Sequence, residues 1–151
     1  MRRTPPQVLG PLLFLRVLTG CAGRGNGVAT PAGGPSLAAW TAPRGAPAYC
    51  SLLARAGSVR ALPVVLGRLS AEPWNLAATR QVGQARADLA DVLAAARADR
   101  GPAELTRALE DLVGALGSAT DAGVTEATAD RIGTDLAAVG HAVQPACGYP
   151  A

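Results

Sequence analysis

Lysine is missing from this 151-residue chain, and aromatic side chains are scarce, at 3%. All 14 basic residues are therefore arginines, and glycine is abundant, with 18 residues. Such a composition is typical of the codon usage of a GC-rich genome, so it does not by itself indicate guanidinium chemistry. Because the arginines form no run and few rings are available to stack on bases, the composition does not favour nucleic-acid binding.

The excess of positive charge belongs to the start of the chain. The formal net charge is +3, yet Arg2, Arg3 and Arg16 precede Cys21 and no acidic residue does. From Cys21 onward, 11 arginines balance 11 acidic residues. We therefore expect no nucleic-acid partner for the rest of the chain.

A long apolar run is also missing. The longest such stretch near the N-terminus, residues 8–15, is far shorter than the roughly 20 residues that a membrane-spanning helix needs. It follows the basic pair Arg2-Arg3 and precedes the small residues Thr19 and Gly20. A basic start, a short apolar stretch and a small-residue cleavage site predict an export signal.

The segment Leu18-Thr19-Gly20-Cys21 resembles the lipobox of bacterial lipoproteins. The resemblance implies a diacylglyceryl group on the sulfur of Cys21 and cleavage of the Gly20–Cys21 bond, which removes residues 1–20. Two acyl chains, at about 0.8 kcal/mol per buried CH₂, would anchor the chain stably at the extracytoplasmic face of the cell membrane. Arg16 departs from the family's apolar pattern and puts the efficiency of processing in doubt.

Residues 21–46 follow as the lipidated Cys21 and a linker rich in glycine and proline. No helical or alternating periodicity is present there, so we predict a disordered spacer with a root-mean-square span of roughly 25–30 Å. Trp40 is its only large aromatic residue, and we expect its ring to dock on the folded part.

Residues 47–151 are predicted to form one all-α domain. Apolar residues recur at three- and four-residue steps, which indicates a bundle of four to five helices. We expect Gly57, Gly117 and Pro145 to end helices, Pro63 to bend one, and Trp74 to anchor the start of the longest. The expected helices cover residues 47–56, 58–69, 74–101, 102–117 and 124–143. Their inward residues include Ala78, Val82, Ala85, Leu89, Val92, Ala96, Leu105, Leu109, Leu112, Val113, Leu116, Ala129, Ile132, Leu136, Val139 and Val143.

Much of this predicted core is alanine. Gly83, Gly114, Gly133 and Gly140 also lie within the predicted helices, and each costs up to about 1 kcal/mol relative to alanine. Small residues let helices approach closely but bury little area, so the domain needs further support.

The three cysteines offer that support. With Cys21 assigned to the lipid, Cys50 near the start of the first helix and Cys147 after the last remain. A bond between them would close a loop of about 97 residues, for which chain entropy predicts about 4–5 kcal/mol. The export signal favours this disulfide, since it implies an oxidising compartment. Two free buried thiols or a metal site are the alternatives, although two cysteines alone make a poor metal site.

Candidate catalytic groups are few. His141 is the only histidine, and its neighbours one helical turn back, Ala137 and Ala138, cannot orient an imidazole. We expect His141 to be solvated or half-buried. No nucleophile elbow, zinc-protease motif or phosphate-binding loop is present, so the sequence predicts no enzyme, no cofactor and no metal.

The acidic residues fit exposed helix faces better than a carboxylate site. We expect helix-stabilising pairs of Arg107 with Glu104 and Asp111, and of Arg131 with Asp135. The other acidic residues considered for a carboxylate pair are Asp88, Asp91, Asp99 and Glu110.

The function predicted from these features is that of a lipid-anchored, non-enzymatic helical module. It would act through contacts with a protein partner at the outer face of the membrane, where its tether raises the effective concentration. Its layout is similar to that of short extracytoplasmic lipoproteins of high-GC Gram-positive bacteria. The alternative is a carrier that holds a small apolar ligand between the helices, which a connected apolar pocket would favour. An enzyme using His141 or a carboxylate pair in a cleft is the third hypothesis.

Overall fold

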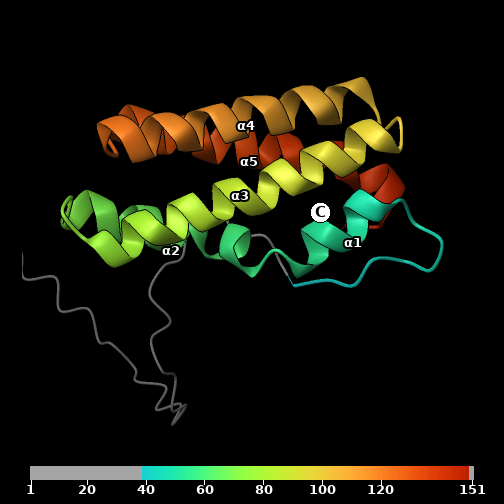
Figure 1. Ribbon diagram of the computed structural model, residues 1–151, viewed down its shortest axis with the longest axis horizontal. Coiled ribbons are helices and arrows are strands. Elements are labelled where there is room, and N and C mark those ends of the chain that lie inside the picture. The colour runs from blue at the N-terminus through green and yellow to red at the C-terminus, as the bar shows by residue number, and fades with distance from the viewer. Residues whose placement is uncertain (1–38, 150–151) are drawn as a thin grey trace, which may run out of the picture. The chain divides into compact units, whose positions relative to one another are not determined.

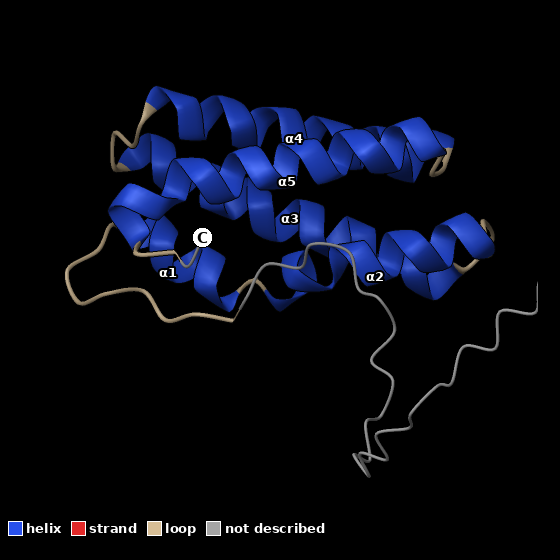
Figure 2. Cartoon of the chain, turned by 180° about the vertical axis from the view of Figure 1, so that it is seen from behind, coloured by secondary structure: helices blue, strands red, loops and turns tan. Residues whose placement is uncertain are grey.

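Five α-helices make up the regular structure of the part of the chain that the computed structural model describes, residues 39–149 (Figure 1). The predicted signal and Leu18–Cys21 lie outside these residues. Helices are the only regular elements between residues 39 and 149, as Figure 2 shows. The helices are α1 (Ala48–Arg55), α2 (Gly57–Ala71), α3 (Leu76–Ala98), α4 (Ala103–Ala122) and α5 (Glu126–Cys147).

Side-chain caps fix the starts of three helices. The side chain of Asn75 accepts a hydrogen bond from the backbone N–H of Ala78 (3.0 Å), and Thr125 caps α5 in the same way. The start of α1 instead uses a distant residue, because the backbone N–H of Ala48 donates to the Asp99 carboxylate (2.8 Å). Each cap satisfies a backbone donor that the first helical turn leaves free.

The helices form an all-α bundle, as the sequence predicts. Helix α3 packs against α1, α2 and α4, while α5 lies along α4 and makes less extensive contact with α1 and α2. Helices α1 and α2 follow each other closely, with axes 44° apart, so together they occupy one side of the bundle (Figure 1).

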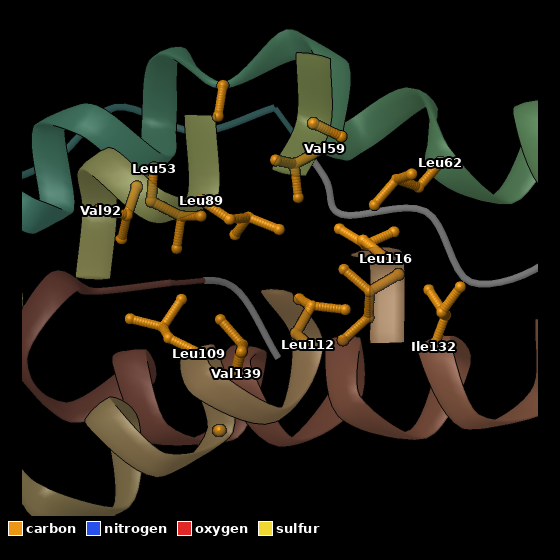
Figure 3. Packing of buried hydrophobic residues seen from close by; sticks show 14 of the residues in the cluster. Leu53, Val59, Leu62, Leu89, Val92, Leu109, Leu112, Leu116, Ile132 and Val139 are labelled. Carbon is orange, nitrogen blue, oxygen red and sulfur yellow. The ribbon is translucent and has the colours of Figure 1, made fainter. Parts of the chain in front are cut away.

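The core lies where α1, α2 and α3 face α4 and α5 (Figure 3). Every residue of the predicted seam of α3 is buried, as are the leucines predicted to point inward from α4. The same three- and four-residue spacing placed Ile132, Leu136, Val139 and Val143 correctly on the buried face of α5.

Two predicted helix ends are wrong. Helix α4 does not stop at Gly117 but continues to Ala122, and Gly117 is buried where the guanidinium of Arg86 lies against it. Helix α5 likewise contains Pro145 and ends at Cys147, followed by Gly148 in the left-handed conformation (φ 60°). Helix α4 continues past Gly117 because the glycine allows close packing against α3. Helix α5 continues past Pro145 because a proline in the final turn removes only one backbone donor.

The junction of the first two helices also differs from the prediction. The break falls at Ala56, Gly57 begins α2, and Ser58 bonds to Asp88 of α3 instead of capping its own helix. Helix α2 runs through Pro63 without interruption. A change of axis of 44° lies before the proline, between α1 and α2.

The last residues of the predicted linker, 39–46, pack on the bundle. Trp40 meets Tyr149 edge to face, with ring centroids 5.6 Å apart, and docks on the folded part as expected. Pro43 lies so close to Gly148 that a Cβ there would be 3.3 Å from its ring. The two ends of the described chain thus pack together.

Candidate functional site

A disulfide joins the first helix to the last. Cys50 lies in α1 and Cys147 in the final turn of α5, both fully buried, with their Cα atoms 5.3 Å apart. The predicted pairing is therefore confirmed, and free thiols or metal ligation are not the state of these two residues. We call this bond the Cys50–Cys147 clasp.

Tyr49 lies beside the clasp and is almost completely buried. Burial raises the pKa of its phenol, and the negative charge of Asp99 raises it further. Asp99 also caps α1, so one carboxylate both anchors the helix that carries Cys50 and adds to the effect of burial on the pKa of Tyr49. These features give the clasped end a structural role.

His141 lies exposed on α5 at a shallow hollow of about 280 Å³. Glu104 lines the same hollow, together with three alanines. Within residues 39–149, no hydrogen-bond partner orients the imidazole. The expectation of a solvated histidine is confirmed, and the described residues place no proton relay around it.

Only some of the ion pairs predicted from the sequence are present in the structure. Arg131 and Asp135 are 3.7 Å apart, as predicted, but the expected pairs of Arg107 are not formed. Among the residues described, the other ion pair joins Arg97 of α3 to Glu110 of α4 at 2.7 Å. Sequence spacing along one helix could not reveal this pair, because it depends on how two helices face each other.

Asp135 is the one described residue with a buried polar side-chain atom that lacks a hydrogen-bond partner. Its Oδ2 lies 3.7 Å from Nε of Arg131, longer than a hydrogen bond. Burial raises the pKa of this carboxyl, and Asp111 raises it further, while Arg131 acts in the opposite direction. Asp111 is thus close enough to Asp135 to oppose its ionisation, which sequence spacing within one helix does not indicate.

An open hollow of about 600 Å³ lies between α2 and α5. Its volume is in the range of small-molecule sites, and its walls are mostly apolar. Ser70 and Asp130 supply polar groups. The residues that line it are Pro63, Leu66, Gly67, Ser70, Ala129, Asp130, Gly133, Thr134 and Leu136.

Three large apolar side chains within residues 39–149 are exposed, and all lie on α2 or at the turn to α3. They are Val64, Trp74 and Leu76, with exposed fractions of 52%, 89% and 75%. Trp74 does not anchor α3 against the bundle, contrary to the expectation, because its ring points into solvent. Asn75 performs the capping instead.

The described residues contain neither a metal-binding cluster nor a single helix able to span a membrane. The described residues contain no group of three or more His, Cys, Asp or Glu side chains arranged to hold a metal ion. None of the five helices alone has the length and apolar character of a membrane span, although the bent pair α1 and α2 together meets that criterion. No family model, curated protein or solved structure matches the chain.

Proposed function

We propose that the chain is an exported lipoprotein, anchored through Cys21, whose helical domain acts through protein contacts at the outer face of the cell membrane. The observation that supports this most directly is the Cys50–Cys147 clasp. Structural disulfides persist in oxidising, extracytoplasmic compartments. With two of the three cysteines bonded to each other, Cys21 remains as the cysteine that the lipobox-like segment would present for lipidation.

Mass spectrometry of the protein purified from its native membrane tests the anchor. The proposal expects a chain that begins at Cys21 and carries acyl chains. Cys21→Ser is the matched variant, since it should leave the leader uncut and the clasp intact. An unprocessed Met1 terminus in the native protein would overturn the proposal.

Partner capture tests the proposed contacts. A photocrosslinker in place of an exposed residue of α4, such as Gly114, should give a discrete protein adduct in intact cells. The same substitution in a Cys21→Ser chain should give less of that adduct, because the tether supplies effective concentration. Equal yields from both chains would contradict a role for the anchor.

A carrier of a small apolar ligand is the alternative that the hollow between α2 and α5 supports. A Cβ added at Gly133 meets no atom within 4 Å, so Gly133→Leu should fill the hollow without a clash. We expect this variant to abolish binding of an environment-sensitive apolar dye. Gly83→Leu is the control, since Gly83 also has open space but does not line the hollow. Absence of dye binding by the unsubstituted chain would remove the carrier hypothesis.

A further inference from the structure

The large apolar residues exposed within residues 39–149 all lie between Val64 of α2 and Leu76 at the start of α3. Val64 and Arg68 lie one turn apart on the solvent face of α2, and Trp74 and Leu76 follow at the turn into α3. Arg80 is exposed one turn later. We call these five residues the α2 surface.

Charge is distributed unevenly between this side and the rest of the domain. Residues 55–80 contain four arginines and a single acidic residue, Glu72. Residues 81–149 contain five arginines and ten acidic residues. The segment that carries the exposed large apolar side chains is therefore basic, whereas the rest of the domain is acidic.

This combination matches the interface of an anionic bilayer. Tryptophan favours the headgroup region, where its ring is apolar and its N–H stays hydrated. Arginines nearby gain from the negative surface potential of anionic lipids. An acidic protein partner would complement the arginines equally well, but it would not explain why Trp74 projects at the apex of a turn.

The proposed anchor brings the bilayer within reach. A glycine-rich stretch of 17 residues, as between Cys21 and Ala39, spans roughly 20–25 Å on average. Helix α3 alone is about 34 Å long, from its 23 residues. The first described residues run beside α1 (Figures 1 and 2), so the chain enters the domain on the side that α1 and α2 occupy.

We infer that the α2 surface contacts anionic lipid, with Trp74 and Leu76 entering the headgroup region and Arg68 and Arg80 facing lipid phosphates. The contact orients the domain, so that α4 and α5 face away from the membrane. This inference rests on the proposed anchoring. Two apolar side chains bind a bilayer weakly by themselves, and the tether makes so weak a contact sufficient.

The test uses the chain from Cys21 onward with Trp40→Phe, which leaves Trp74 as the single tryptophan. Because the other cysteines are bonded, the thiol of Cys21 can be coupled to maleimide-bearing lipid in phosphatidylglycerol vesicles. We expect the emission of Trp74 to shift to shorter wavelength on coupling and to be quenched by brominated lipid. Arg68→Gln with Arg80→Gln should reduce both effects on these vesicles.

A reporter at the opposite end of the domain is the control. The chain with Trp40→Phe, Trp74→Phe and Ala103→Trp places an exposed ring at the start of α4 and should show neither shift nor quenching. Unshifted emission from Trp74 on coupled vesicles, or equal quenching of both reporters, would overturn the inference. A shift without vesicles that grows with protein concentration would assign the surface to a second copy and also overturn it. Because chemical coupling replaces cellular lipidation, these outcomes are separate from the test of the anchor.

Discussion

Asp135 shows most clearly how a single side chain sets a property of the domain. Its carboxyl is largely buried, one oxygen lacks a donor, and the nearest cation is Arg131 at 3.7 Å. The ionised form is therefore poorly compensated, while the protonated form suits the site. Exposed neighbours such as Glu110, paired at 2.7 Å, carry no such penalty.

We predict that Asp135→Asn stabilises the domain at neutral pH. The pKa of Asp135 is raised in the folded state, so the fold binds this proton more tightly than the unfolded chain does. The stabilising effect of the proton is fully present below the ordinary pKa of an aspartate and is lost as pH rises from that value through the folded pKa. Melting temperatures across this range should fall for the parent chain and change less for Asp135→Asn.

Asp130→Asn provides the control for that series, since Asp130 is exposed one turn earlier on α5. Its melting temperature should follow the parent's pH dependence. An Asp135→Asn variant that melts below the parent at pH 7 would show that the charge of Asp135 is compensated after all.

At the scale of helices, the periodicity of apolar residues predicted the buried faces more reliably than single glycines and prolines predicted the helix ends. The seams of α3 and α4 were predicted correctly because a 3.6-residue repeat over five or more turns identifies one face whatever lies opposite. The helix ends predicted at Gly117 and Pro145 were wrong because packing between helices and the clasp outweighed the local preferences of these two residues. Neither the Arg97–Glu110 pair nor the exposure of Trp74 could be predicted, since both depend on how helices face each other and the solvent.

We predict that Gly83→Ala with Gly114→Ala raises the melting temperature. Both glycines lie inside helices, and a Cβ at either meets no atom within 4 Å. Alanine should therefore add up to about 1 kcal/mol per site through helix propensity alone. Chemical denaturation measures the gain.

Gly148→Ala is the matched contrast, because Gly148 has a positive φ and its Cβ would press on Pro43. This variant should lose stability. A loss of stability in the double alanine variant instead would contradict the prediction and show that the fold does not accommodate the added Cβ atoms.

At the scale of the molecule, much of the stability depends on one covalent link. The core is built largely from alanine and leucine, and the clasp closes a loop with a sequence separation of 97 residues. Chain entropy assigns such a closure at most about 4–5 kcal/mol. Marginal domains are typically stable by only about 5–15 kcal/mol, so this link is a large share.

We predict that Cys50→Ser with Cys147→Ser lowers the free energy of unfolding by about 2–4 kcal/mol. The parent chain in reducing agent should show a similar loss, and Cys21→Ser should show none. Circular dichroism during thermal unfolding measures all three. Equal stability of the parent and the double variant would show that the helices alone hold the fold.

The clasp has a mechanical consequence as well. A pull applied to the chain on the N-terminal side of Cys50 and on the C-terminal side of Cys147 is carried by the bond between them. Tension between the two ends of the chain therefore crosses the disulfide and bypasses α2, α3 and α4 entirely. Under the proposed anchoring, such tension would leave α2, α3 and α4 folded.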